Sequence, residues 1–464
     1  MDLSLGEAAA ILGSVSREPE RVAQSYSIDT RTLRAGALFF ALQGPNFDGH
    51  SFVPQAIRQG AAGAVVERGW AASAPENLFP LLIPVADTVS ALQDLGRAVR
   101  RKWGGPLIAV TGSTGKTTTK ELISAALGAR YVVHKSAENL NNHLGVPLSL
   151  LALSPRHEVA VLELGMSHAG EIAHLAAIAE PGVGVVTNVA PAHLEFFESI
   201  DAIAAAKREL IENLARPSTA VLNYDDERVR SFRDGFTGRV VTFGFEPGAD
   251  YRATEFRLGA DGAGSVASVF RVRGAEFDVE FRLPLPGRHN VENALAAVTV
   301  GRLMGVSTEA IGAALAGFSS LRRRAEVLRL PGSVTLINDC YNSNPRALDQ
   351  MLDLLRDWPG AVRRIAIAGE MLELGPSAPE LHRAAGRKCA SSGVQWLLAV
   401  QGNAEAMVEG AVEAGLPRER ARFFGDAGEA GCFGRSILQT QDVVLVKGSR
   451  GVHLERAVEE LMRD

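Results

Sequence analysis

The segment LIAVTGSTGKTTTKELISAALG, residues 107–128, decides the fold. An apolar run typical of a buried strand leads through a glycine-rich loop into a helical pattern. In such a loop the backbone N–H groups can surround phosphate oxygens, and the positive end of the helix dipole adds to the attraction. The segment therefore predicts a phosphate-binding loop in a parallel α/β domain, and with it a protein that uses ATP or GTP.

The polar residues of this loop have distinct expected roles. The Lys116 ammonium can reach the β- and γ-phosphates, and the Thr117 hydroxyl can ligate Mg²⁺. The full G-x-x-x-x-G-K-[ST] pattern is not met, because its first position falls on Val110. A chance glycine-rich turn is the alternative, which the order of strand, loop, GKT and helix disfavours. The candidate nucleotide-binding residues here are Gly112, Ser113, Thr114, Gly115, Lys116, Thr117 and Thr118.

Length, charge and cysteine content limit the class of protein. At ~150 residues per domain, 464 residues predict about three domains. Lys and Arg number 48 and Asp and Glu 53, a net charge of −5, which is too balanced for binding nucleic acid through massed positive charge. We expect neither a signal peptide nor a membrane span. Three widely spaced cysteines without a C-x-x-C pair, Cys340, Cys389 and Cys432, favour a reducing cytoplasm over a disulfide framework or a zinc site.

The pattern of elements predicts an α/β fold of three domains. We expect a small N-terminal α/β domain over residues 1–85, which the segment FPLLIPV would leave, and a central parallel-sheet P-loop ATPase domain over residues 86–320. A Rossmann-like α/β domain over residues 321–464 follows. In SVFRVRGAEFDVEFRL, residues 268–283, apolar and polar residues alternate, which predicts an antiparallel hairpin insert with a turn near Gly274.

Two polar residues follow strand-like runs of the central domain. In an open parallel sheet the ligand lies beyond the carboxyl ends of the strands. Glu163 ends the run VAVLE, where an unpaired buried carboxylate would be costly, and His193 follows the run VGVV. Taken singly, a satisfied core glutamate and a loop histidine are the simpler explanations. Together with Lys116 they favour a nucleotide site that includes a metal ion.

Lys207 lies within a helical pattern over residues 200–214. At ~100° per residue it falls in the middle of the apolar stripe of that helix. The stripe consists of Ile200, Ile203, Leu210, Ile211 and Leu214. A lysine whose head reaches solvent would explain this position. A desolvated lysine with a lowered pKa, used in catalysis or chemically modified, would explain it equally.

Taken together, these motifs resemble those of the ATP-dependent Mur ligases of peptidoglycan precursor synthesis, which build amide bonds from carboxylates. The resemblance extends over nearly the whole chain. It rests on SIDTR (27–31), TGSTGKTTT (111–119), ELG (163–165) with HAGEI (168–172), NVAPAHL (188–194), AAKREL (205–210), LPGRHNVENALAA (285–297), DCYNSNP (339–345), MLELG (371–375) and LVKGSRG (445–451).

Within the family, three segments resemble the branch that adds D-alanyl-D-alanine to UDP-N-acetylmuramoyl-tripeptide. They are NLNN (139–142), DCYNSNP and MLELG. The branch that adds the third residue would carry a D-N-P-R motif later in the chain than Asn344-Pro345-Arg346. Glu370 stands where the family usually has aspartate, so the resemblance assigns it no role.

The resemblance implies a set of site residues. The implied catalytic residues are Lys116, Glu163, His193 and Lys207. Thr117 would hold one Mg²⁺, and a carbamylated Lys207 with Glu163 and His193 would hold a second. Asn293, Arg324 and Asp339 would complete the ATP site. The implied substrate contacts are Asp29, Thr30 and Arg31, facing the UDP-sugar, and Asn141, Asn142 and Ser167.

The resemblance also implies a mechanism. ATP would phosphorylate the terminal carboxylate of the UDP-linked tripeptide, and the amine of D-Ala-D-Ala would then displace phosphate from the acyl phosphate. The C-terminal domain would close onto the central one and exclude water. The partners would be these small molecules, acted on by a cytoplasmic monomer that binds no nucleic acid and does not span a membrane.

Three alternatives stay open. A sibling ligase that adds a single amino acid is disfavoured by the missing D-N-P-R motif. A folylpolyglutamate synthase of the same superfamily is disfavoured by the D-T-R segment near residue 30. A nucleotide-gated UDP-sugar-binding protein without ligase activity is disfavoured because all four implied catalytic residues are present.

Overall fold

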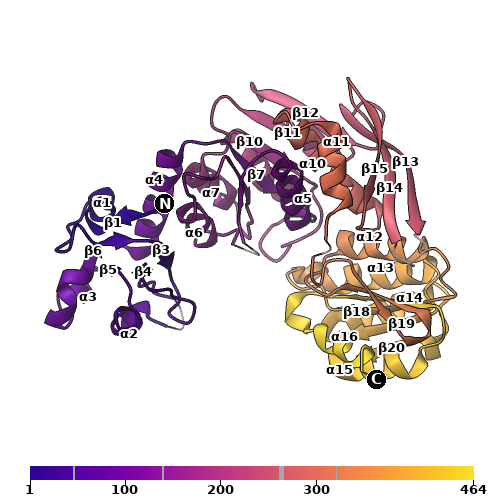
Figure 1. Ribbon diagram of the computed structural model, residues 1–464. Helices are drawn as coiled ribbons and strands as arrows, with labels where there is room; N and C mark the ends of the chain where they lie inside the picture. The colour runs from indigo at the N-terminus through magenta and orange to yellow at the C-terminus, as the bar shows by residue number, and fades with distance from the viewer. Residues whose placement is uncertain (45–46, 138–139, 261–265, 320, 464) are drawn as a thin grey trace.

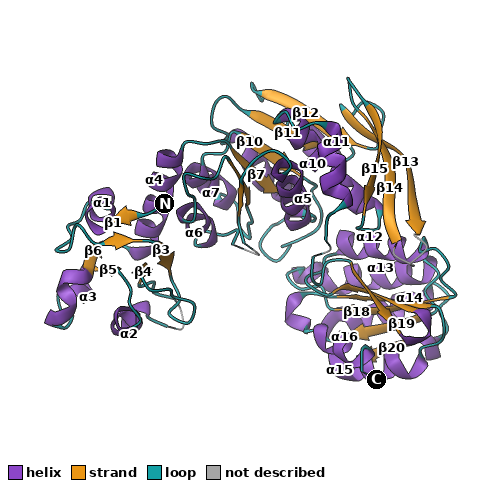
Figure 2. Ribbon diagram, in the orientation of Figure 1, coloured by secondary structure: helices purple, strands orange, loops and turns teal. Residues whose placement is uncertain are grey.

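The computed structural model describes residues 1–44, 47–137, 140–260, 266–319 and 321–463. It contains three α/β units, each built on its own sheet. The first and last units of the chain lie at opposite ends of the molecule, with the middle unit between them (Figure 1, Figure 2). The predicted α/β fold class is confirmed. Asn139 of the NLNN motif and residue 320, at the expected domain boundary, lie outside the described residues.

The first unit is built on a parallel sheet in the order β3-β4-β5-β6, with an antiparallel ribbon of β1 and β2. Its strands are β1 (Leu3–Ser4), β2 (Val22–Ala23), β3 (Ser25–Ser27), β4 (Ala37–Phe40), β5 (Gly63–Glu67) and β6 (Leu82–Val85). Its helices are α1 (Leu5–Ile11), η1 (Gly49–Phe52), α2 (Val53–Arg58), α3 (Arg68–Ala71) and η2 (Glu76–Leu81).

The segment FPLLIPV does not leave this unit, contrary to expectation. Its last four residues form β6, which pairs in parallel with β5. Because β6 is an edge strand, Pro84 can lack its N–H without costing a buried ladder hydrogen bond. A proline-bearing apolar run is therefore compatible with a strand when one side of that strand stays unpaired.

The middle unit is built on a nine-stranded sheet in the order β15-β14-β13-β12-β11-β10-β7-β9-β8. Its strands are β7 (Leu107–Thr111), β8 (Val133–Lys135), β9 (Val159–Glu163), β10 (Val183–Val186), β11 (Thr219–Asn223), β12 (Arg239–Gly244), β13 (Tyr251–Ala260), β14 (Val266–Arg273) and β15 (Asp278–Leu283). Its helices are α4 (Thr88–Trp103), α5 (Lys116–Gly128), α6 (Gly145–Leu151), α7 (Glu171–Ala179), α8 (Ile200–Glu212), α9 (Glu227–Ser231), α10 (Arg288–Leu303) and α11 (Thr308–Ala316).

The predicted hairpin is confirmed as β14 and β15, which pair antiparallel. Its turn is closed by the Gly274 N–H, which donates to the Phe277 carbonyl at 2.9 Å. β13 is not predicted from the sequence, and it pairs in parallel with β12 and antiparallel with β14. The hairpin therefore continues the main sheet through β13, which pairs with Phe243 and Gly244 at the end of β12.

The last unit is built on a sheet in the order β16-β17-β21-β18-β19-β20, parallel except for the β16–β17 pair. Its strands are β16 (Glu326–Leu330), β17 (Val334–Asp339), β18 (Arg363–Gly369), β19 (Trp396–Val400), β20 (Ala421–Phe424) and β21 (Asp442–Lys447). Its helices are η3 (Pro331–Ser333), α12 (Pro345–Arg356), η4 (Gly375–Ser377), α13 (Ala378–Ser391), η5 (Gly402–Ala404), α14 (Glu405–Glu413), η6 (Arg418–Arg420), α15 (Ala427–Ile437), η7 (Arg450–Val452) and α16 (Glu455–Leu461).

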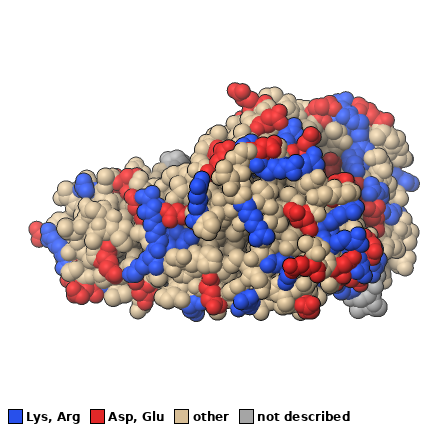
Figure 3. All heavy atoms as spheres, turned by 90° about the horizontal axis from the view of Figure 1, so that it is seen from above, with Lys and Arg blue, Asp and Glu red and all other residues tan. Residues whose placement is uncertain are grey.

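The surface carries charges of both signs. On the face drawn in Figure 3, Lys and Arg side chains are interspersed with Asp and Glu, as the net charge of −5 leads one to expect. Among the described residues, no helix combines the length and apolar character that crossing a membrane requires.

The free energy of unfolding should decrease as the pH is lowered, because of His134, a buried residue of β8. Burial lowers the pKa of His134 from its ordinary 6.5 to about 4, because its ring is withdrawn from water, and the hydrogen bond of Nε2 with the Ser149 carbonyl oxygen at 2.7 Å only partly opposes this. The unfolded chain therefore binds more protons than the folded one between these two values. We expect the stabilising effect of the neutral ring to be complete above pH 6.5 and to be lost as pH falls toward 4.

Urea unfolding at a series of pH values measures this. The variant His134→Gln keeps an N–H donor for the Ser149 carbonyl without titrating, and should show a flatter pH dependence below 6.5. His174→Gln, at an exposed position of α7, serves as the control. Equal slopes for all three proteins would contradict the role of His134.

Candidate functional site

A cavity of about 950 Å³ lies between the middle and last units. Two sheets end at it. From the middle sheet come the loop after β7 and Glu163 at the end of β9, and from the last sheet come Asp339 at the end of β17 and Lys447 at the end of β21. Ligands of open parallel sheets bind beyond such carboxyl ends. Here two of these edges face each other across one cavity.

The phosphate loop is held in shape from below by Asn188. Its side-chain Oδ1 accepts from the Thr114 backbone N–H and hydroxyl, each at 3.0 Å, and its Nδ2 donates to the Thr114 carbonyl at 3.2 Å. Gly115, the N-cap residue of α5, has φ +79°, and a Cβ there would lie 2.4 Å from Asn293 Oδ1. Only glycine fits this position, because both the backbone angle and the space exclude a side chain.

Most of the predicted loop residues line the cavity. They are Ser113, Thr114, Gly115, Lys116, Thr117 and Thr118, whereas Gly112 is not among the lining residues. Lys116 Nζ donates to the Gly112 carbonyl at 2.9 Å, so the lysine folds back over the loop. Desolvation lowers the pKa of Lys116, with Glu163 opposing and Arg324 adding to the change. An anionic ligand at the loop would offset this desolvation.

Glu163 supplies a carboxylate at the end of β9. The residue is 2% exposed, and its two oxygens accept from the Thr117 hydroxyl at 2.7 Å and the Asn141 amide at 2.8 Å. Carboxylate and hydroxyl oxygens are ligands suited to Mg²⁺, so this donor set fits the ion that the resemblance implies. In the part of the chain that the structure describes, no three His, Cys, Asp or Glu side chains are grouped to hold a metal. Other oxygens, such as those of phosphate, would have to complete the coordination.

Lys207 lies on α8 and is 2% exposed, as the apolar stripe predicts. Within the described residues its ammonium has no hydrogen-bond or ion-pair partner. Burial, and secondarily the charge of Lys116, lowers the pKa of Lys207 well below its usual range. The side chain is not one of those that line the cavity. Lys207 is therefore a desolvated amine whose charge interacts with that of Lys116 in the phosphate loop.

His193 connects the two units. It lines the same cavity as Glu163, but its Nδ1 lies 2.5 Å from the Glu373 carboxylate of the last unit. The hydrogen bond to His193 lowers the pKa of Glu373. Beside it, the Glu195 N–H donates to the Glu373 carbonyl at 3.1 Å. The segment MLELG, to which the sequence assigned no site residue, therefore supplies part of the contact between the units through Glu373.

The other predicted ATP-site residues come together at the cavity. Asn293 Oδ1 accepts from the Thr119 hydroxyl at 3.1 Å, which fixes α10 against the helix of the phosphate loop. Arg324 lies 3.9 Å above the ring of Tyr341. Asp339 accepts from Lys447 Nζ at 2.5 Å. All three predicted residues, Asn293, Arg324 and Asp339, line the cavity.

The predicted substrate residues fall into two groups. Asn141, Asn142 and Ser167 line the cavity. Asp29, Thr30 and Arg31 belong to the first unit and lie outside it, where Arg31 pairs with Asp29 at 2.6 Å and its side chain is 86% exposed. An exposed guanidinium held by its neighbour is available to an anionic ligand at the first unit.

The structure adds cavity residues to which the sequence analysis gives no role. They are His289, Tyr341, Ser343, Lys447, Arg450 and Glu373. Burial lowers the pKa of His289 to about 4, so its ring is neutral at pH 7. Ser343 has a buried hydroxyl without a partner among the described residues. The signal that could have identified several of them is their position directly after β17 and β21.

Comparison with known proteins places this geometry in a family. Residues 23–100 match the Mur ligase family catalytic domain, 110–301 the Mur ligase middle domain and 323–450 the Mur ligase glutamate ligase domain. A relative from Bacillus subtilis (strain 168), named "UDP-N-acetylmuramoyl-tripeptide--D-alanyl-D-alanine ligase", is 32% identical over 443 residues, covering 96% of this chain and 94% of the relative. The chain belongs to the Mur ligase family.

Further relatives carry the same name or fold. A relative from Synechocystis sp. with the same name is 37% identical, and the alignment covers 94% of this chain and 91% of the relative. A crystal structure of MurF from Acinetobacter baumannii matches with TM-score 0.90 and 31% identity, covering 100% of this chain and 99% of that one. MurF ligase from Thermotoga maritima, in complex with ADP, matches with TM-score 0.83 and 28% identity over 95% and 97%. A Mycobacterium tuberculosis folylpolyglutamate synthase, at 16% identity and TM-score 0.65, shares the fold alone.

Replacing Lys116 tests whether nucleotide binds at the loop. We expect Lys116→Ala to weaken ATP binding about 10- to 100-fold, because a charged hydrogen-bond donor to phosphate is worth about 1.5–3 kcal/mol. Isothermal calorimetry with ATP and MgCl₂ measures this. Lys102→Ala is the control, since Lys102 pairs with Glu7 on an exposed surface. An unchanged affinity in Lys116→Ala would contradict the site.

Proposed function

We propose that this Mur ligase joins D-alanyl-D-alanine to UDP-N-acetylmuramoyl-tripeptide. The reaction consumes ATP, releases ADP and phosphate, and yields the pentapeptide precursor of peptidoglycan. The observation that carries the proposal is the cavity in which the phosphate loop of one sheet faces the strand ends of another. Relatives with this name that align over nearly the whole chain support the choice of substrates.

The chemistry begins with activation of the tripeptide carboxylate. A carboxylate oxygen attacks the γ-phosphorus of ATP, the bond to the β-phosphate oxygen breaks, and an acyl phosphate forms. The backbone N–H groups of the phosphate loop and the Lys116 ammonium attract the transferring phosphoryl group. Lys116 is suited to this task because it already lies over the loop, donating to the Gly112 carbonyl.

The second step forms the amide bond. The free amine of D-Ala-D-Ala attacks the acyl carbon, the adduct expels phosphate, and the amine nitrogen loses its proton. Glu373 and His193 join the two units beside the cavity, which keeps water from the acyl phosphate while the amine approaches. Because the acceptor enters between the units, we assign its binding to the last unit, residues 321–464 by the sequence division.

Thr117 and Glu163 are the residues that would hold Mg²⁺. Their oxygens already lie 2.7 Å apart, and the Asn141 amide orients the second carboxylate oxygen. Bound there, the ion would neutralise phosphate charge and so favour phosphoryl transfer. The residues' own contribution is to present two oxygens at the mouth of the phosphate loop.

Lys207 is proposed to carry a carbamate. Its uncharged amine adds to the carbon of CO₂ and loses a proton, which gives an anionic oxygen pair that, with Glu163 and His193, would hold a second Mg²⁺. Support comes from its burial, its lowered pKa and the lack of a partner among the described residues. The modification converts an unpaired, buried neutral amine near Lys116 into an anion that can pair with that lysine.

The first unit is proposed to bind the UDP-sugar through Asp29, Thr30 and Arg31. The exposed guanidinium of Arg31 supports this, since a diphosphate needs a cation. Asn141, Asn142 and Ser167 would then meet the peptide end in the cavity. The three cysteines are free, which supports a reducing cytoplasm, and we propose that the protein acts as a monomer.

Phosphate release with a panel of acceptors tests the function. With ATP, Mg²⁺ and UDP-MurNAc-tripeptide, we expect turnover with D-Ala-D-Ala that exceeds turnover with D-Ala, D-Glu or L-Lys by at least about 100-fold, a difference of ~2.7 kcal/mol in transition-state binding. Tripeptides ending in L-lysine and in diaminopimelate are both supplied. Turnover with single amino acids and none with D-Ala-D-Ala would overturn the proposal.

Chemical rescue tests the carbamate. We expect Lys207→Ala to lose about 10²- to 10³-fold in kcat, and a short carboxylate such as acetate to restore part of it by supplying an anion where the carbamate stood. Arg208→Ala, one residue away on α8, removes a half-buried side chain that pairs with Glu212, and it should keep its activity and gain nothing from acetate. A negligible loss in Lys207→Ala would show the carbamate to be unnecessary.

A further inference from the structure

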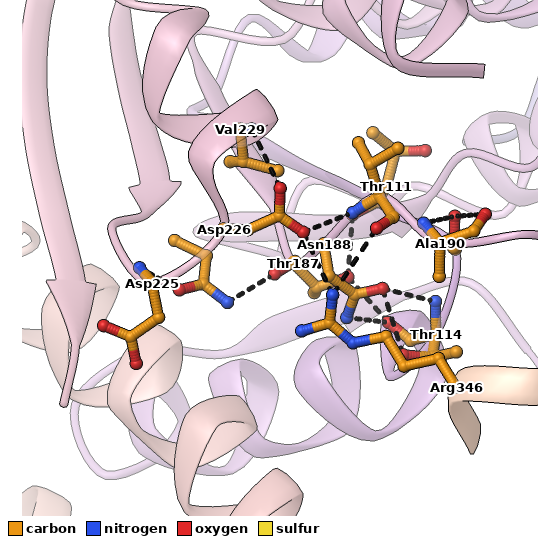
Figure 4. A network of polar contacts seen from close by, with 12 residues as sticks. Thr111, Thr114, Thr187, Asn188, Ala190, Asp225, Asp226, Val229 and Arg346 are labelled. Carbon is orange, nitrogen blue, oxygen red and sulfur yellow. Dashed lines mark hydrogen bonds and ion pairs between the residues drawn. The ribbon is translucent and has the colours of Figure 1, made fainter. Parts of the chain in front are cut away.

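Arg346 of the last unit reaches into the middle unit. It lies in the first turn of α12, and its Nη1 donates to Asp226 Oδ2 at 3.1 Å and to the Val189 carbonyl at 3.4 Å. Figure 4 shows Arg346 and Asp226 pointing toward one another, while Asp225 is turned away. We call the Arg346–Asp226 pair the latch. It is separate from the His193–Glu373 contact that lies beside the cavity.

Asp226 is firmly held before Arg346 reaches it. Its side chain is 7% exposed, it caps α9 by accepting from the Val229 N–H at 3.2 Å, and its other oxygen accepts from the Val189 N–H at 2.9 Å. Without Arg346 this carboxylate would be buried with no cation among its described hydrogen-bonding partners. A guanidinium at this position therefore meets a preformed receptor on the other unit.

Residues 187–190, which we call the strap, join the latch to the phosphate loop. Val189 contacts the latch through both of its backbone polar groups. One residue earlier, Asn188 holds Thr114 through three hydrogen bonds, and its carbonyl accepts from the Ser113 N–H at 2.9 Å. Figure 4 shows these contacts as one continuous network. A single turn of backbone thus lies between the last unit and the loop that holds phosphate.

We propose that Arg346 is a positioning residue for ligation, because through Asp226 and the strap it fixes the last unit in register with the phosphate loop. This inference rests on the proposed function and deepens it. Asp339 and Lys447 stand on the sheet that α12 covers, so the placement of α12 sets how these groups meet a nucleotide held at Lys116. Arg346 itself does not line the cavity and touches no reacting atom.

Electrostatics around Arg346 agree with this role. Burial raises the pKa of Glu292, a cavity-lining residue on α10, and the charge of Arg346 opposes that rise. Arg346 therefore acts on two carboxyl groups of the middle unit, on Asp226 by direct contact and on Glu292 through its charge. Separating the units would leave both without this cation, so the charges favour the joined arrangement.

Kinetics of Arg346→Ala test the proposal. We expect kcat to fall about 10- to 100-fold, since small misplacement of reacting groups has effects of that size, while KM for the UDP-substrate changes less than about threefold. Arg346→Lys should recover part of kcat, because its ammonium can still reach Asp226. Arg356→Ala is the matched control on the same helix, since Arg356 pairs only with Asp353 and Asp357 of its own unit among the described residues.

Asp226→Asn closes a double-mutant cycle. It keeps an oxygen for the α9 cap but loses the charge, so its effect on kcat should not add to that of Arg346→Ala. Small-angle scattering with ATP analogue and UDP-substrate should show less compaction for Arg346→Ala than for Arg356→Ala. An Arg346→Ala kcat within twofold of the control, or fully additive effects, would overturn the proposal.

The design separates two kinds of failure. If the unsubstituted protein does not use D-Ala-D-Ala, the proposed function is wrong. The role of Arg346 is still tested in that case, because the kcat values of Arg346→Ala and Arg356→Ala are then compared with the acceptor that the protein does use. Thermal melting of each variant identifies loss of folding. If Arg346→Ala unfolds, the Arg346→Lys and Asp226→Asn variants decide, and unchanged kcat in both would overturn the proposal.

Discussion

The phosphate loop keeps its shape because the surrounding side chains leave room for its backbone and form hydrogen bonds with its backbone polar groups. Asn188 does the second by bonding both the N–H and the carbonyl of Thr114. Asn293, at the start of a helix buried almost all round, occupies the space that a side chain at Gly115 would need. The loop, the end of β7 and α10 therefore pack together, and the cavity lies against them.

Positively and negatively charged side chains face one another around the phosphate loop. Lys116 and Arg324 bring positive charge to one region, where burial and the charge of Lys116 lower the pKa of Lys207. Glu163 and Asp339 are held by hydrogen bonds on either side. A cavity built in this way attracts phosphate and carboxylate groups even though the chain as a whole is mildly acidic.

Local patterns predicted local features. The loop at Lys116, the buried carboxylate of Glu163 and the stripe position of Lys207 each follow from spacing within one element. β13 escaped prediction because its pairing register shifts between Thr254 and Arg257, which interrupts the alternation that marks a strand. The contacts of Glu373 and Arg346 could not be predicted, since they depend on how two separately folded units meet, and no periodicity within either encodes that.

The middle and last units each form one wall of the cavity, and this has a pharmacological consequence. A compound that fills the space between the His193 loop and Leu372 need not resemble a nucleotide to block turnover. Such a compound acts as a spacer, because a molecule too thick to fit between the middle and last units holds them apart. Affinity for such a wedge comes from shape and apolar area, and it does not have to compete with triphosphate for the cations.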